Sequence, residues 1–147
     1  MPANLAFFGI DRAEDVRSAN AYGSYRHWYL AGHSLGGAMA ASYAGKHADA
    51  WDGLVLLASY STADLSGTDL RVLSLYGSDD GVLNRAKVRE ARRLMPRAYT
   101  ERVIRGGNHA RFGSYGRQRG DGEAAISAAK QRARTVAAVR EFVTAGE

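Results

Sequence analysis

The most restrictive feature of this sequence is the short stretch Gly32–Gly37, which reads Gly-His-Ser-Leu-Gly-Gly. Before it, His27–Ala31 is an aromatic and aliphatic run typical of a buried strand. After it, Ala38–Ala44 is rich in strong helix formers and is closed by Gly45. A strand, a Gly-x-Ser-x-Gly turn and a helix in this order predict a nucleophile elbow, a sharp turn that presents a serine hydroxyl at the end of a strand.

The residue types in this stretch match what such a turn requires. Ser34 must adopt a strained backbone conformation, and its neighbours must be small enough for strand and helix to approach closely. Gly32 and Gly36 lack a Cβ atom and meet that need. The following helix would direct its N-terminus and the amide of Leu35 toward a developing oxyanion. We therefore predict Ser34 as a nucleophile and Leu35 as an oxyanion donor. The alternative is a glycine-rich turn with an incidental serine.

Three further runs predict strands. Gly53–Ser59 and Arg71–Tyr76 are almost wholly apolar, as parallel strands covered on both faces are. Glu101–Arg105 reads as a shorter and more exposed strand. Strands that alternate with helices predict right-handed crossovers and a parallel sheet. We therefore expect an α/β fold in one domain over residues 1–147, with a parallel sheet of about four strands flanked by helices.

The helices are predicted from caps and apolar spacing. Asn84 is the expected cap of a helix that ends before Pro96. The last helix is expected over Ser127–Thr144, with four residues directed inward: Ala129, Ala133, Val136 and Val143. Met1–Ala19 fits either a short strand or a helix, and we favour the helix.

Polar groups with complementary chemistry follow three of the predicted strands: Ser34, the pair Asp79-Asp80, and His109. In parallel sheets, functional groups gather beyond the carboxyl ends of the strands. A serine needs a base to take its proton, and the base works best when a carboxylate orients it. The order Ser, Asp, His therefore predicts a nucleophile, an orienting acid and a general base.

The other histidines are weaker candidates for the base. His27 precedes its strand, at the wrong end of the sheet, and His47 ends a helix. His33 lies inside the turn, where packing or hydrogen bonding is the favoured role. His109 follows the last strand in a loop with two glycines, which would allow its ring to reach the serine. The alternative is that His109 is an ordinary surface histidine.

Three segments together carry a specific resemblance to a known family. They are Gly32–Gly37, Tyr76–Asn84 with the sequence Tyr-Gly-Ser-Asp-Asp-Gly-Val-Leu-Asn, and Gly106–Gly116, which begins Gly-Gly-Asn-His and ends Tyr-Gly. Over nearly its whole length, the chain resembles the bacterial α/β-hydrolase fold-5 family. By that resemblance, Ser34 would be the nucleophile of a serine hydrolase acting on a carboxylic ester or related acyl bond, with Asp80 as orienting acid and His109 as general base.

The resemblance has three further implications. The acid of this superfamily commonly follows a strand as Gly-x-x-Asp, which Gly77–Asp80 matches only with Asp80, so Asp79 would be a turn or capping residue. Members carry a further N-terminal half, so this chain would be the C-terminal half of the fold. The strand near His27–Ala31 would then be an open edge available for self-association, and an inactive half-domain is the alternative function. Gly113–Gly122 resembles the loop after the histidine.

Composition limits the remaining classes of partner. The chain has no cysteine, which excludes disulfides, thiolate metal sites and cysteine nucleophiles. Its net charge of +5 invites a nucleic-acid reading, but the basic residues concentrate in two helix-periodic clusters without interleaved aromatic residues, Arg85–Arg97 and Lys130–Arg140. We expect a small-molecule acyl substrate, no nucleic acid, no cofactor, no metal and no membrane span. Leu5–Ile10 is too short for a secretory signal, so the default location is cytoplasmic, with an upstream targeting segment left open.

Overall fold

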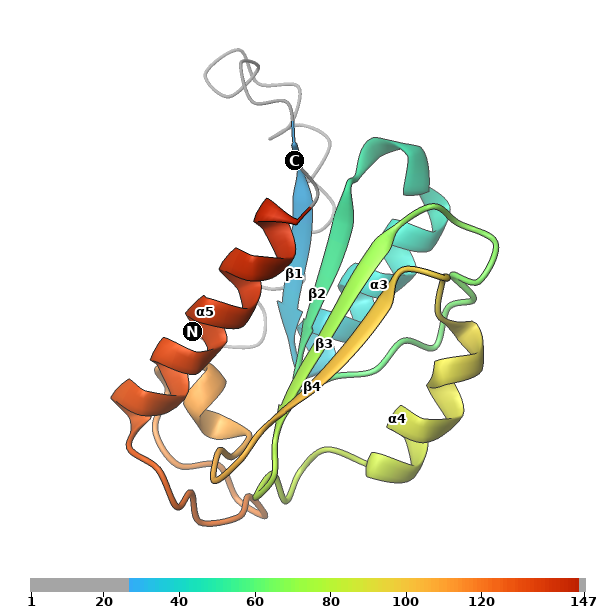
Figure 1. The fold of residues 1–147 in the computed structure, drawn as a ribbon. Coiled ribbons are helices and arrows are strands. Elements are labelled where there is room, and N and C mark those ends of the chain that lie inside the picture. Colours follow the sequence, from blue (N-terminus) through green and yellow to red (C-terminus); the bar gives the residue numbers. More distant parts are fainter. Residues whose placement is uncertain (1–26, 146–147) are drawn as a thin grey trace.

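The computed structural model describes residues 27–145, and the helix favoured within Met1–Ala19 lies outside them. The described chain forms one sheet of four parallel strands with helices on both faces (Figure 1). Across the sheet the strands lie in chain order: β1 (Tyr29–His33), β2 (Gly53–Leu57), β3 (Arg71–Gly77) and β4 (Tyr99–Ile104). The predicted fold class, a parallel sheet of about four strands flanked by helices, is confirmed.

The two faces of the sheet are covered by different helices because side chains of a strand alternate between faces. Helix α3 (Leu35–Lys46) packs its alanines against Leu54, Leu56 and Val72. Helix α5 (Ala128–Thr144) packs against the alternate positions, including Val55 and Leu73, on the opposite face. No helix in residues 27–145 combines the length and hydropathy needed to cross a membrane.

Helix α4 (Arg85–Ala91) begins at the predicted cap, since the Asn84 side chain accepts a hydrogen bond of 3.1 Å from the Lys87 amide. The turn Arg92–Leu94 continues it as a 3₁₀-helix before Pro96. Two more 3₁₀ turns, at Ala48–Ala50 and Ala110–Phe112, complete the described elements.

The first strand lies two residues later than predicted. The sequence indicated His27–Ala31, whereas β1 runs from Tyr29 to His33. Gly32 and His33 stay in the strand because the parallel ladder pairs them with Leu56 and Leu57 of β2. Only Ser34 remains in the turn before α3 begins.

The inward face of α5 also differs from the prediction. Val136 is 60% exposed, Ala129 and Ala133 are exposed, and only Val143 packs against the core. The buried side chains are instead Gln131, Ala138 and Phe142. The alanines of this helix could pack inward on more than one face, so the large Phe142 ring sets which face meets the sheet. The Phe142 ring lies 5.9 Å from that of Tyr29 and 4.6 Å from the Arg71 guanidinium.

The side chain of Glu101 on strand β4 is the centre of a cluster of hydrogen bonds. It accepts hydrogen bonds from Arg92 at 2.6 and 2.8 Å, from the Tyr76 hydroxyl at 2.7 Å and from the Tyr99 hydroxyl at 2.9 Å. The bonds from Arg92 lower the pKa of Glu101 to about 2, against the opposing effect of burial, and the two tyrosines add to the lowering. The ionised carboxylate therefore stabilises the fold.

Replacing Glu101 with glutamine is expected to lower the free energy of unfolding at neutral pH by about 2–3 kcal/mol, following the lowered pKa. Because the pKa of Glu101 in the folded chain lies below its ordinary 4.5, the stabilisation is present above about pH 4.5 and is lost as pH falls through about 2. Urea unfolding followed by tryptophan fluorescence should show wild type and Glu101→Gln converging in acid. A stability gap independent of pH would contradict the prediction.

Candidate active site

The turn after β1 holds Ser34 in a strained conformation. Its φ is 53° and its ψ is −124°, a region that side chains disfavour at a cost of about 1–3 kcal/mol. Two hydrogen bonds hold it, from the Ser34 amide to the Leu57 carbonyl at 2.9 Å and from the Ser59 hydroxyl to the Ser34 carbonyl at 2.7 Å. A Cβ on Gly32 would lie 2.4 Å from the Gly36 carbonyl oxygen, so the predicted close approach of strand and helix is confirmed.

Leu35 is the first residue of α3, directly after this turn. Amides of the first helical turn have no acceptor within the helix, and the helix dipole gives this end partial positive charge. Further into the helix, the amides of Gly37 and Ala38 donate to the Ser34 carbonyl at 3.0 and 3.3 Å. The Leu35 amide is therefore placed next to Ser34, at the end of a helix of 12 residues. Its oxyanion role stays a prediction.

Asp80 and His109 form a buried pair beyond the ends of β3 and β4, and because the strands are parallel this is the end of the sheet at which Ser34 follows β1. The Nδ1 atom of His109 lies 2.9 Å from Oδ2 of Asp80, and their side chains are 1% and 0% exposed. The other Asp80 oxygen accepts from the amides of Val82 at 2.9 Å and Leu83 at 2.8 Å. Burial acts to raise the pKa of Asp80, but these hydrogen bonds, that from His109 first, hold it below the ordinary value.

The second ring nitrogen of His109 is left for other chemistry. Its Nε2 atom is buried and has no hydrogen-bond partner among the described residues. With Nδ1 directed to an ionised carboxylate, the neutral ring carries its proton on Nδ1 and offers a lone pair at Nε2. An imidazole held in this tautomer can accept a proton from a neighbouring hydroxyl.

His33 connects this pair to the serine turn. Its ring centroid lies 4.7 Å from that of His109, and it directly precedes Ser34. The rings of Phe112 and Tyr115 lie 6.1 and 5.8 Å away. Burial, followed by the charge of His109, lowers the pKa of His33 to about 4, so its ring is neutral at neutral pH. This arrangement agrees with the packing role expected for His33.

Comparison with known proteins agrees with the fold described above. A family model described as the alpha/beta hydrolase family matches residues 1–133. The chain belongs to the alpha/beta hydrolase family. No match was found among curated proteins.

Solved structures with the same fold include other alpha/beta hydrolases. A CIB-like hydrolase from Thermoplasma acidophilum is 19% identical with a TM-score of 0.58, covering 73% of this chain and 52% of that one. MGS-MChE2, an alpha/beta hydrolase from the metagenome of lagoon sediments at Mar Chica, Morocco, is 17% identical with a TM-score of 0.57, covering 71% and 61%. A carboxylesterase structure from Nitrososphaera gargenis is 12% identical with a TM-score of 0.66, covering 96% and 72%. The chain thus spans about half to three fifths of the first two.

The competing candidate residues of this chain lie elsewhere or serve local structure. His27 pairs with Asp52 at 3.1 Å, beside the start of β2 and thus at the far end of the sheet. His47 follows the last residue of α3. Asp79 accepts a hydrogen bond of 2.9 Å from the neighbouring Ser78 hydroxyl, whereas the acceptor for His109 is Asp80.

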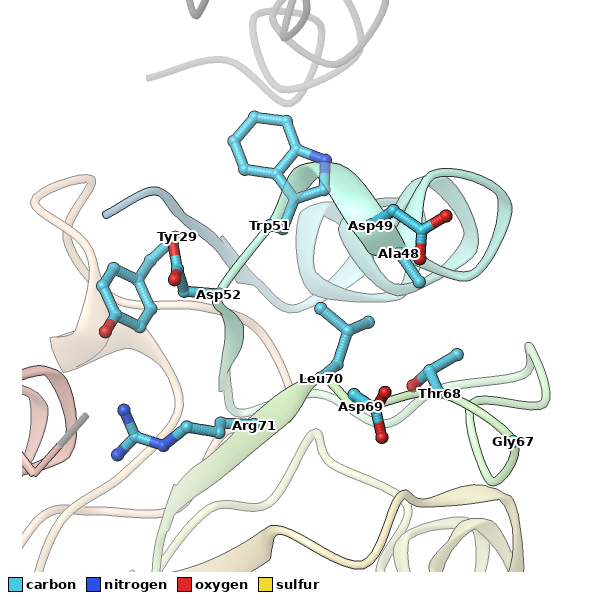
Figure 2. A pocket seen from close by; sticks show the side chains of 10 residues that line it. All are labelled: Tyr29, Ala48, Asp49, Trp51, Asp52, Gly67, Thr68, Asp69, Leu70 and Arg71. Atoms are coloured by element: carbon cyan, nitrogen blue, oxygen red, sulfur yellow. The ribbon is translucent and has the colours of Figure 1, made fainter. Parts of the chain in front are cut away.

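A cavity of about 450 Å³ opens at the opposite end of the sheet (Figure 2). It lies among residues at the starts of the first three strands, including Tyr29, Asp52 and Arg71. None of the predicted site residues lines it. Within residues 27–145, no three His, Asp or Glu side chains are grouped so as to hold a metal ion.

Two polar residues missed by sequence reasoning hold the backbone around His109. Gln131, fully buried on α5, accepts from the Asn108 amide at 3.0 Å and donates to the Asn108 carbonyl at 2.8 Å. Asp121 accepts from the amides of His109 and Ala110 at 3.1 and 2.8 Å. The usable signal for Asp121 was its place between two glycines in the segment after the histidine. Gln131 gave no such signal, because helix α5 carries many polar residues.

Proposed function

We propose that this chain is a serine hydrolase that cleaves a carboxylic ester or a related acyl bond through a covalent acyl-enzyme. The observation that carries the proposal is the buried hydrogen bond between Asp80 and His109, whose ring lies 4.7 Å from that of the residue before Ser34. Family membership and the chain order Ser, Asp, His support it. An ester is the first substrate class to test because one structural neighbour is a carboxylesterase.

The acylation step assigns one role to each group. The Ser34 oxygen attacks the carbonyl carbon of the ester while its proton passes to Nε2 of His109. The carbonyl oxygen becomes an oxyanion, to which the Leu35 amide donates. When the intermediate collapses, the bond to the alkoxy group breaks and His109 returns the proton to the leaving alcohol. Asp80 stabilises the imidazolium that exists between these two transfers.

Deacylation repeats the sequence with water in place of serine. His109 takes a proton from the water as its oxygen attacks the acyl carbon, and a second oxyanion forms beside Leu35. Collapse releases the carboxylic acid, and the proton on His109 returns to the Ser34 oxygen. Both halves need the same neutral tautomer of His109, which the hydrogen bond from Nδ1 to Asp80 favours.

A fluorophosphonate probe tests the proposal directly, because it reacts covalently with an activated serine. We expect labelling of the folded chain, loss of labelling after heat unfolding, and a single modified peptide containing Ser34. Hydrolysis of p-nitrophenyl esters with graded acyl chains would then define the preferred acid. Absence of labelling in folded protein would refute the proposal.

Association through the edge of β1 is a second candidate function. None of the five β1 residues is buried, whereas four of the five β2 residues are. Among the described residues, β1 has a strand neighbour on one side only, which leaves backbone groups for pairing with a second copy or a separate fragment. Sedimentation velocity separates the candidates: a stable monomer that the probe labels supports the hydrolase and removes the reason for this alternative.

A further inference from the structure

The segment after His109 packs against the turn that carries Asp80. The Asp121 carboxylate makes this connection with both oxygens. Oδ2 accepts from the Ala110 amide at 2.8 Å, while Oδ1 accepts from the His109 amide at 3.1 Å and the Gly81 amide at 3.2 Å. One side chain therefore binds the backbone at the predicted base and the backbone directly after the predicted acid.

The backbones of these segments also lie in direct contact. A Cβ on Gly122 would lie 1.9 Å from the Asp79 carbonyl oxygen, and one on Gly81 would lie 2.5 Å from the Gly120 carbonyl oxygen. Contacts this close require glycine at both positions, because any side chain would overlap the facing backbone. The stretch Gly120-Asp121-Gly122 therefore packs directly against the backbone of the turn that carries Asp80.

Only a carboxylate fits the bonding pattern around Asp121. All of its partners named above are N–H donors, and a carboxylate is acceptor-only at both oxygens. An asparagine would keep one acceptor and turn an NH₂ group toward a backbone N–H, leaving that donor unsatisfied. The charge of Asp121 also acts on the His33 ring: burial dominates the lowered pKa of His33, and the charges of Asp80 and Asp121 oppose it.

We propose that Asp121 is a positioning residue that keeps His109 within hydrogen-bonding distance of Asp80. Its carboxylate also supplies negative charge near the His109 imidazolium. The inference rests on the proposed hydrolase function and deepens it. Asp121 touches no reacting atom; it acts through the backbone of His109 and Gly81. This gives the segment 113–122 a role in the site.

The test compares Asp121→Asn with Glu123→Gln, which neutralises an exposed carboxylate two positions further along the chain. Asp121→Asn is expected to lower kcat by about 10²-fold with little change in KM, because small displacements of a catalytic group have effects of this size. Loss of the nearby negative charge should also move the acidic limb of the kcat/KM profile to lower pH. Glu123→Gln should match wild type in both, and Asp121→Glu should recover part of the rate.

A second measurement does not depend on turnover. The His109 Nδ1 proton, hydrogen-bonded to Asp80, should give a low-field proton NMR signal in wild type that broadens or disappears in Asp121→Asn. If the wild-type protein neither turns over ester nor reacts with the probe, the proposed function fails. The NMR signal still tests whether Asp121 positions His109 against Asp80. The inference would be overturned if Asp121→Asn kept the wild-type kcat, the wild-type acidic limb of the kcat/KM profile and the low-field NMR signal. Equal losses in Asp121→Asn and Glu123→Gln would also overturn it.

Discussion

Replacing Ser34 with alanine is expected to lower kcat by about 10⁶-fold, the scale seen when a serine triad loses its nucleophile. The reason is that Ser34 is the group proposed to form the acyl bond, and without it the His109 and Asp80 pair has no hydroxyl proton to accept. Fluorophosphonate labelling should vanish in the same variant. Steady-state hydrolysis of the best p-nitrophenyl ester, measured beside the labelling experiment, checks the prediction. Retained turnover with full labelling elsewhere would place the nucleophile at another residue.

Two variants at the same position should reveal the backbone strain of the turn. Ser34 has a φ of 53°, where glycine is not strained and alanine is. Ser34→Gly should therefore be more stable than Ser34→Ala by about 1 kcal/mol, after the greater flexibility of unfolded glycine is counted, although both are inactive. Urea unfolding of the two variants measures the difference. A less stable glycine variant would show that the turn carries no strain at this residue.

Replacing Asp80 with asparagine is expected to lower kcat by about 10⁴-fold. An asparagine can keep the acceptor for the Val82 and Leu83 amides and turn its NH₂ group toward Nδ1 of His109. That contact favours the tautomer with the proton on Nε2, which cannot accept the proton of Ser34. The loss should therefore appear in kcat without loss of the fold, as measured by ester hydrolysis and circular dichroism.

Asp79→Asn is the matched control, since the two carboxylates are adjacent and equal in charge. The Asp79 side chain accepts a hydrogen bond of 2.9 Å from the Ser78 hydroxyl, whereas the His109 ring bonds to Asp80. We expect near wild-type kcat from this variant. The reverse outcome, with Asp79→Asn inactive and Asp80→Asn active, would exchange the assignments of acid and turn residue.

Features that depend on neighbouring residues were predictable from the sequence. The small residues around Ser34 reflect a strand and helix that meet at one residue, and the structure shows the close contact at Gly32. Helix caps are similarly local: the Ser127 hydroxyl accepts from the Lys130 amide at 3.2 Å, where the last helix was predicted to start. The alternation of apolar strands with helices also sufficed for the parallel sheet, because crossovers of this length have one favoured geometry.

Features set by long-range contacts were not predictable in the same way. The register of β1 depends on pairing with β2, and the shift of two residues relative to the prediction follows from that ladder. The inward face of α5 depends on where Phe142 meets the sheet.

The sequence by itself determined the fold class and named Ser34, Asp80 and His109 as candidates, because these conclusions need only short motifs and their order. Tertiary structure decided what holds the histidine in place. Asp121 and Gly81 are 40 positions apart in the chain, yet they share a hydrogen bond. A partner at that separation is chosen by the packing of whole loops against one another, and no local pattern in the chain encodes it.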